Sequence, residues 1–276
     1  MMLMAFAHTW PAAWCAMLGI LGLLIGSFLN VVIWRLPKML AEQWRDEARQ
    51  TLDLPHPPRQ TYNLCWPPSA CSTCQQPILR RDLLPVLSWC WLRGESRCCK
   101  RSISLRYPLV ESACCFLFVV AGLLWPPGLQ LAASLVFICI LLTLAVIDAQ
   151  TMLLPDVLTL PLIWLGLLVN FVGCYVPLPS ALIGAISGYL ALALLSLIFT
   201  RLTGKAGLGG GDAKLLAALG AWLGWEVLPQ LVTVAAVGGL LGAVIMHRLR
   251  RHPLNQPVAF GPWLILSAGY FLFLTP

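Results

Sequence analysis

The chain has 276 residues, of which 59% are hydrophobic and only 11% are charged. A soluble globular domain carries about 25% charged residues, so this composition excludes an ordinary soluble protein. The formal net charge is +7, but no soluble basic domain carries it, which argues against binding to nucleic acid. The composition predicts an all-α bundle of membrane-spanning helices in contact with lipid.

The first apolar stretch, residues 12–34, is predicted to be a transmembrane helix. It is too long for the core of a signal peptide, and no cleavage pattern of small residues follows it. Near its end, Gly26 and Ser27 permit close helix packing, and Asn30 is able to hydrogen-bond across helices. Helix packing and contact with a substrate are equally compatible with these three residues.

A polar insert, residues 37–106, follows the first span. Its beginning, 40–53, is predicted to form a short amphipathic helix, and the proline-rich stretch 54–68 is predicted to be irregular.

Cysteines in the second half of the insert predict a structural zinc site. Cys71 and Cys74 form a CxxC pair, and Cys99 lies further along with Cys98 beside it. Two cysteine pairs at this separation in a reducing compartment are typical of tetrahedral zinc. A second CxxC would require a cysteine at position 96, where this chain has Ser96. Cys98 is the first candidate for the fourth ligand. Cys65, Cys90 or a water molecule are the other candidates for this ligand, and a knuckle without metal is the alternative to a zinc site.

Seven further apolar runs have the length of membrane spans. They lie near 109–126, 129–148, 157–176, 180–200, 212–227, 229–247 and 258–274. The prediction is therefore about eight transmembrane helices.

The basic residues predict the orientation of this bundle. Of the 18 Lys and Arg, twelve lie in 35–106, three in 201–214 and three in 248–251. With eight spans these segments share one side, which the positive-inside rule makes cytoplasmic. Both termini are therefore expected on the outer side.

Two aspartates beside apolar runs are the candidate catalytic residues. Asp212 follows the glycine run Gly209–Gly211. Asp148 is the last residue of the apolar run 129–148. A carboxylate at membrane depth marks a functional site by default. Two carboxylates in a poorly solvated site share a proton and can activate water, as aspartic peptidases do.

Two other acids near the cytoplasmic boundaries leave alternatives open. Asp156 follows Pro155, where a carboxylate stabilises a helix N-terminus, so capping and catalysis both suit it. Glu111, at the start of the second span, is suited to pairing with Arg106 or to shaping the active site. We favour the structural role for Glu111.

The ordered motifs of the chain resemble those of the bacterial prepilin peptidases. These motifs are distributed over nearly the whole chain. They are Gly26–Pro37, the CxxC at Cys71–Cys74, Pro85–Trp89, Ile103–Glu111, Asp148, Leu154–Asp156, Gly209–Asp212 and Phe260–Pro262. The glycine–aspartate motif alone is weak, whereas the ordered set is specific.

The resemblance implies an enzyme with two activities in the bacterial inner membrane. One activity cleaves the basic leader of type IV prepilins or of type II secretion pseudopilins. The other methylates the new N-terminal residue with S-adenosylmethionine. Asp148 and Asp212 match the catalytic pair of the family, and Gly94 matches a glycine associated with methylation. The family also has a four-cysteine zinc motif, from which this chain departs at Ser96.

We expect three residues beside the aspartates to support the active site: Gly209, Gly211 and Lys214. The expected domains are a first helix (1–36), the insert (37–106) and a peptidase core (107–276). The alternatives are a proton-coupled transporter and a peptidase that cleaves spent signal peptides. A transporter of this kind predicts internal repeats, which the sequence lacks. The cysteine-bearing insert argues against the signal-peptide peptidase.

Overall fold

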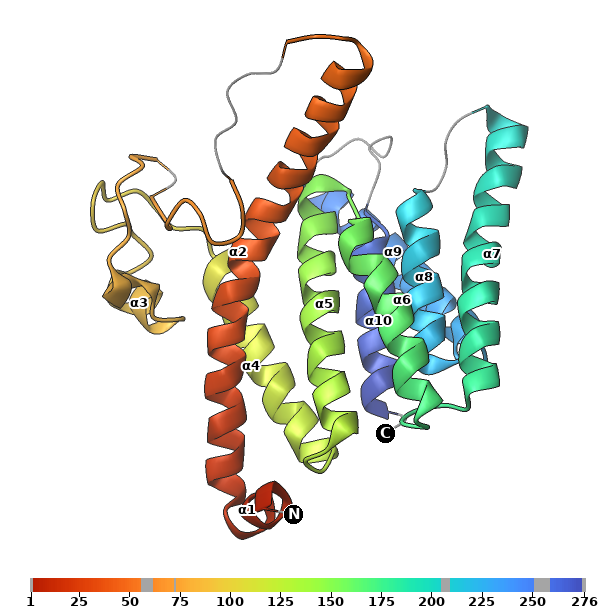
Figure 1. Ribbon diagram of the computed structural model, residues 1–276, viewed down its shortest axis with the longest axis horizontal. Helices are drawn as coiled ribbons and strands as arrows, with labels where there is room; N and C mark the ends of the chain where they lie inside the picture. The colour runs from red at the N-terminus through yellow and green to blue at the C-terminus, as the bar shows by residue number, and fades with distance from the viewer. Residues whose placement is uncertain (1, 56–61, 72, 205–208, 251–258, 275–276) are drawn as a thin grey trace. The chain divides into compact units, whose positions relative to one another are not determined.

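The computed structural model describes residues 2–55, 62–71, 73–204, 209–250 and 259–274 (Figure 1). Helices make up the regular structure of these ranges, and only two isolated β-bridges interrupt the coil between them. The all-α prediction is confirmed. The chain divides into two compact units, Met1–Leu123 and Leu124–Pro276, and each is described by itself.

Helices occupy all eight predicted positions. Their bounds are α2 (Pro11–Thr51), α4 (Arg106–Leu124), α5 (Leu129–Thr151), α6 (Asp156–Phe171), α7 (Leu178–Thr203), α8 (Gly210–Leu223), α9 (Leu228–Arg250) and α10 (Gly261–Leu274). Among the described residues, five helices are long and apolar enough to cross a membrane: α2, α4, α5, α7 and α9. The other three have 14 to 16 residues, which gives each a length of about 21 to 24 Å.

Residues 40–51 are helical, as predicted, but they do not form a short helix of their own. Helix α2 runs without a break for 41 residues, through Pro37, from the apolar span into the polar segment (Figure 1). Proline removes one backbone hydrogen bond, but good helix formers such as Leu36 and Lys38 stand on both sides of it. A single lost bond therefore does not end the helix.

In the first unit, the insert is anchored to α2 by a buried arginine. Arg35 donates hydrogen bonds to the carbonyl oxygens of Asn63 at 2.8 Å and of Pro67 at 2.6 Å. Backbone carbonyls satisfy the guanidinium, so a proline-rich segment with few bonds of its own is held in place. Three short helices complete the unit: α1 (Met2–Thr9), the 3₁₀ helix η1 (Arg80–Leu83) and α3 (Leu87–Trp91).

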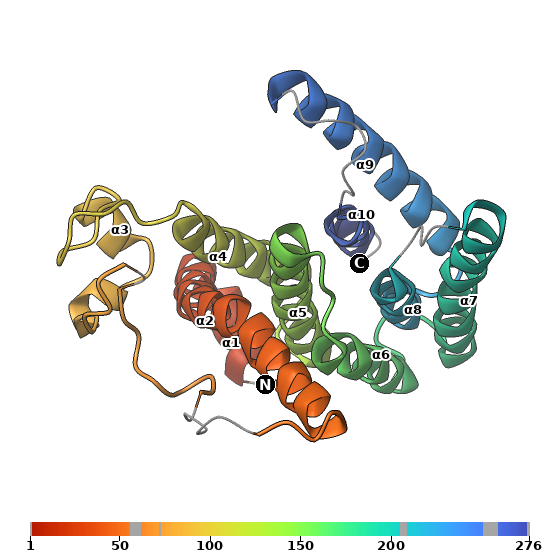
Figure 2. The ribbon, with the colours of Figure 1, turned by 90° about the horizontal axis from the view of Figure 1, so that it is seen from above.

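The second unit is built around α8, whose residues from Leu215 to Leu223 are all buried. Helices α6 and α7 lie beside α8 in both views (Figures 1 and 2). The α7–α8 contact is made by glycines, since a Cβ at Gly188 would lie 2.7 Å from the Leu216 carbonyl oxygen. Trp222 stacks on Phe137 of α5 with 4.4 Å between ring centroids. This packing fixes the N-terminal turn of α8, where Asp212 lies.

Candidate active site and cysteine cluster

Asp148 lies in the last turns of α5 and is only 4% exposed. The backbone N–H of Gly261, at the start of α10, interacts with its carboxylate. Its Oδ2 atom has no hydrogen-bond partner among the described residues. A Cβ added at Gly261 would lie 2.5 Å from that Oδ2, so only glycine fits here. The second unit therefore holds a buried carboxylate oxygen that is available to a ligand.

Asp212 lies in the first turn of α8, as the glycine run before it allows. Its backbone N–H donates to the carbonyl oxygen of Gly209 at 3.1 Å. Its side chain is half-buried and lies within range of the charge of Asp148. The two aspartates that the sequence predicted as a pair, 64 positions apart (212 − 148), are thus brought together.

Leu154, for which the sequence predicts no role beyond its place in a motif, packs between the segments that carry the two aspartates. A Cβ added at Gly211 would lie 2.9 Å from the Cβ of Leu154. A Cβ added at Gly261 would lie 3.4 Å from its Cδ1. Leu154 therefore contacts the glycine beside Asp212 and the glycine beside Asp148. The sequence does show glycine at both positions. A glycine without a side chain lets a neighbouring residue such as Leu154 pack closely against the backbone.

Lys214 and Asp156 form an ion pair beside this site. The Nζ atom of Lys214 lies 2.7 Å from each carboxylate oxygen of Asp156. Asp156 is the first residue of α6, as predicted, and follows the N-cap residue Pro155. The ion pair connects the first turns of α6 and α8, one helical turn beyond Gly211. Of the two alternatives for Asp156, the structure favours a structural role.

Four cysteines of the insert come together: Cys71, Cys74, Cys98 and Cys99, with all sulfur atoms within 4.8 Å of one another. The Sγ atoms of Cys71 and Cys99 are 3.7 Å apart, and those of Cys74 and Cys98 are 3.2 Å apart. Tetrahedral zinc with bonds of about 2.3 Å separates its sulfur ligands by about 3.8 Å. The donor set therefore fits zinc. The other two candidate cysteines, Cys65 and Cys90, are not part of this cluster.

The two cysteine turns repeat each other with an offset of 25 positions. In the first, the N–H of Gln75 donates to the Cys71 carbonyl, and in the second the N–H of Lys100 donates to the Ser96 carbonyl, both at 2.9 Å. An isolated β-bridge closes each turn. Ser96 therefore stands at the position of Cys71, and its hydroxyl lies 3.1 Å from the Cys99 sulfur.

Two thiols of the cluster, Cys71 and Cys98, have pKa values that are shifted in opposite directions. Backbone N–H groups of Cys74 and Thr73 lower the pKa of the Cys71 thiol to about 6. The contact with Cys74 raises the pKa of Cys98 to about 12. Cys71 is thus prepared to act as a thiolate ligand, whereas Cys98 requires the charge of a metal to lose its proton.

Comparison with known proteins agrees with these sites. Residues 20–125 match the bacterial peptidase A24 N-terminal domain, and residues 135–245 match the type IV leader peptidase family. A prepilin leader peptidase/N-methyltransferase from Dickeya chrysanthemi is 53% identical over 99% of this chain and 96% of its own length. One with the same name from Pectobacterium carotovorum subsp. carotovorum is 51% identical over 98% and 96%. The chain belongs to the prepilin leader peptidase/N-methyltransferase family. No solved structure matches it.

As a member of this family, the chain is an inner-membrane enzyme with an endopeptidase and an N-methyltransferase activity. The sequence-based identification is therefore confirmed. The transporter and signal-peptide peptidase alternatives are not favoured.

Gly94, which the resemblance associates with methylation, occupies a position that requires glycine. Its φ is +74°, and a Cβ there would lie 2.9 Å from the Trp89 ring. Its carbonyl accepts the N–H of Ile103 at 2.6 Å. A side chain at position 94 would strain this turn and displace the tryptophan.

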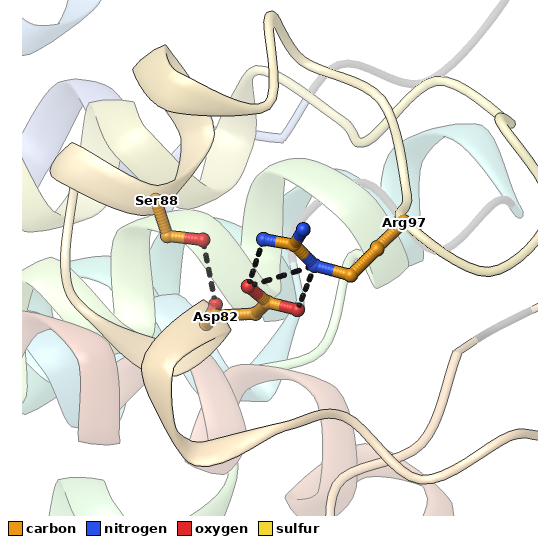
Figure 3. A network of polar contacts seen from close by, with 3 residues as sticks. All are labelled: Asp82, Ser88 and Arg97. Carbon is orange, nitrogen blue, oxygen red and sulfur yellow. Dashed lines mark hydrogen bonds and ion pairs between the residues drawn. The ribbon is translucent and has the colours of Figure 1, made fainter.

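An ion pair ties the second cysteine turn to the rest of the insert (Figure 3). Arg97 binds both carboxylate oxygens of Asp82, with Nη2 2.9 Å from Oδ1 and Nε 3.0 Å from Oδ2. The hydroxyl of Ser88 donates to the Asp82 carbonyl at 2.8 Å. The bond to Arg97 lowers the pKa of the Asp82 carboxyl below its usual range. The contact therefore stabilises the insert at neutral pH and weakens as Asp82 is protonated in acid.

Proposed function

We propose that this enzyme cleaves the basic leader of type IV prepilins or type II secretion pseudopilins, with Asp148 and Asp212 as its catalytic pair. The observation that carries the proposal is the buried, unpartnered Oδ2 of Asp148 beside the carboxylate of Asp212. Membership in the family supplies the substrate class. Mutation of the two aspartates, described in the Discussion, tests the assignment.

The proposed chemistry is general acid–base hydrolysis. One carboxylate takes a proton from a water molecule as its oxygen attacks the scissile carbonyl carbon. The protonated carboxyl group gives its proton to the leaving amine as the C–N bond breaks. Gly209 and Gly211 permit the close approach, and the Lys214–Asp156 ion pair holds the first turn of α8. The products are a free leader peptide and a new N-terminal amine.

We further propose that both termini face the periplasm and that the aspartates lie near the cytoplasmic face. The support is the distribution of all 18 Lys and Arg. A prepilin has its basic leader in the cytoplasm and its apolar stem in the membrane, so its scissile bond would lie at that depth. Part of the two later cytoplasmic loops, 205–208 and 251–258, lies outside the described residues.

This orientation predicts which positions a membrane-impermeant maleimide reaches in intact cells after the outer membrane has been opened. Thr203→Cys and His247→Cys should gain no label over the parent protein, whereas Gly128→Cys should be labelled. After lysis, all three should react. Labelling of Thr203→Cys or His247→Cys before lysis would contradict the proposed orientation.

For the cysteine cluster, we propose a structural zinc ion held by Cys71, Cys74, Cys98 and Cys99. Such an ion stabilises a small domain directly, because the unfolded insert has no preformed site. The support is the sulfur geometry and the donor set. In this arrangement Cys98 replaces the ligand that the family has at position 96.

The zinc site predicts about one zinc per chain by elemental analysis of the purified protein. Cys71→Ser and Cys98→Ser should each lower the zinc content strongly, whereas Cys65→Ser, outside the cluster, should leave it unchanged. Both losses should reduce methyl transfer more than leader cleavage. A Cys98→Ser protein with a full complement of zinc would show that another group is the fourth ligand.

We propose a functional division into the first helix (1–36), the zinc-binding insert (37–106) and the peptidase core (107–276). The boundary between the two compact units lies after Leu123, because α4 packs on α2. The proposed division therefore describes the roles of the segments and not how they pack. S-adenosylmethionine is the proposed methyl donor, with Gly94 in the part of the chain that serves methylation.

A further inference from the structure

In the first unit, α2 and α4 meet at a contact that leaves no room for side chains. A Cβ added at Gly26 would lie 2.8 Å from the Cα of Glu111. One turn further along α2, Asn30 contacts Tyr107, which lies one turn earlier in α4. The two helices are therefore antiparallel here, and Asn30 and Glu111 lie on facing surfaces about one turn apart.

Glu111 is 7% exposed, and both of its described partners are uncharged. Its Oε2 accepts the backbone N–H of Val86 at 2.8 Å, and the hydroxyl of Ser27 also donates to the carboxylate. A buried carboxylate supported only by neutral donors is expensive to maintain. An ionic ligand would compensate for its charge.

Asn30 is 3% exposed and only half satisfied. Its Nδ2 donates to the Tyr107 carbonyl at 3.1 Å. Its Oδ1 has no donor within the part of the chain that the structure describes. Native proteins rarely leave such an acceptor buried, and each case requires an explanation. A donor from outside the protein would satisfy this oxygen.

The two side chains lean toward each other. Helical side chains tilt toward the N-terminus of their own helix. Because α2 and α4 run in opposite directions, Asn30 tilts toward the level of Ser27 and Glu111 tilts toward the level of Tyr107. This tilt directs a buried carboxylate and an unpartnered amide oxygen toward the same part of the α2–α4 contact.

A primary ammonium group matches this site. Its positive charge would compensate the Glu111 carboxylate, and one of its three N–H donors would satisfy Oδ1 of Asn30. The peptidase reaction produces such a group, because the α-amine of a new N-terminus has a pKa near 7.7–8.0 and is largely protonated at neutral pH. The same nitrogen is the nucleophile that becomes methylated.

We propose that Asn30 and Glu111 bind the new N-terminal amino group of the cleaved substrate for methylation. The proposal rests on the methyltransferase activity of the family and not on the assignment of the aspartate pair. The ammonium passes one proton to the Glu111 carboxylate. The nitrogen lone pair then forms a bond to the methyl carbon of S-adenosylmethionine as the S–C bond breaks, which leaves a methylated ammonium and S-adenosylhomocysteine.

The hydrogen bond from the backbone N–H of Val86 to Glu111 can be replaced by a hydrogen bond from the ligand. Val86 donates to Glu111 from a φ of +56°, a conformation that β-branched residues avoid. An ammonium that takes the same carboxylate oxygen would allow Val86 to leave this conformation. Entry of the substrate is thus coupled to relief of backbone strain.

The test measures methyl transfer apart from cleavage. The purified full-length enzyme receives S-adenosylmethionine with a labelled methyl group and a synthetic peptide that already begins at the new N-terminus. Glu111→Gln should lower methyl transfer at least about tenfold, through both kcat and the KM for the peptide, because the amide neither accepts the proton nor compensates the charge. The KM for S-adenosylmethionine and the rate of leader cleavage should stay within about twofold. Asn30→Leu should act in the same direction, and Glu47→Gln, an exposed acid on α2, should change nothing.

A competition experiment separates binding from a structural effect. The wild-type enzyme should be inhibited more strongly by the free-amine peptide than by the same peptide acetylated at its N-terminus, and Glu111→Gln should lose this preference. Unchanged discrimination in Glu111→Gln, or a parallel loss of cleavage and methylation, would overturn the proposal. The peptide needs no cleavage. The competition result can therefore be interpreted even if the assignment of Asp148 and Asp212 as the catalytic pair fails.

Discussion

Asp148→Asn and Asp212→Asn should each reduce leader cleavage by a factor of about 10³ or more, because an amide can neither accept the proton of water nor pass it on. The two losses should not add in the double variant, since the carboxylates act as one unit. Purified enzyme and a full-length prepilin, with products separated by mass, suffice for the measurement. Methylation of a pre-cleaved peptide should survive both substitutions.

Asp156→Asn is the matched control for this prediction. It also replaces a carboxylate by an amide, but in the residue that is paired with Lys214 at 2.7 Å. An ion pair with an exposed carboxylate contributes little to stability, so its loss should slow cleavage only mildly. Substantial cleavage by Asp212→Asn, or a complete loss in Asp156→Asn, would reassign the catalytic pair.

Gly261→Ala should lower leader cleavage about 100-fold although it removes no polar group. The added methyl group would lie 2.5 Å from Oδ2 of Asp148, closer than any real contact, so the carboxylate or the start of α10 must move. A displacement of about 1 Å in an active site can lower the rate about 100-fold. The measurement is the cleavage rate of the purified variant, together with its thermal stability in detergent.

Gly269→Ala provides the control, because it lies in the same helix with no atom within 4 Å of the added Cβ. It should cleave at the wild-type rate and be slightly more stable, since alanine is the better helix former. Wild-type cleavage by Gly261→Ala would show that α10 does not border the catalytic carboxylates.

The helices could be predicted from the sequence because their signals are local. Long apolar runs, proline-rich connections and clustered basic residues fix where spans begin and end to within a few residues. The continuity of α2 through Pro37 could not be predicted from the sequence. It depends on whether the helix propensity of the residues on both sides outweighs the hydrogen bond that proline removes.

The candidate residues could also be predicted, but their partners could not. Asp148 and Asp212 stand out as charges at membrane depth, whereas nothing in the sequence says that Leu154 touches the glycine beside each of them. Likewise, the spacing of the cysteines left Cys98, Cys65 and Cys90 as rival ligands. The repeated turn brings Cys98 to the cluster and leaves the other two outside it.

Composition and motif order by themselves determined that this protein is a helical membrane enzyme of the prepilin peptidase type. The tertiary structure decided which atoms meet: Gly261 against Asp148, Lys214 with Asp156, and Asn30 with the Tyr107 carbonyl. The physical reason is distance along the chain. Apolar periodicity and helix propensity act within a few turns, whereas these contacts join residues 58 or more positions apart and depend on how closely helices approach at their glycines.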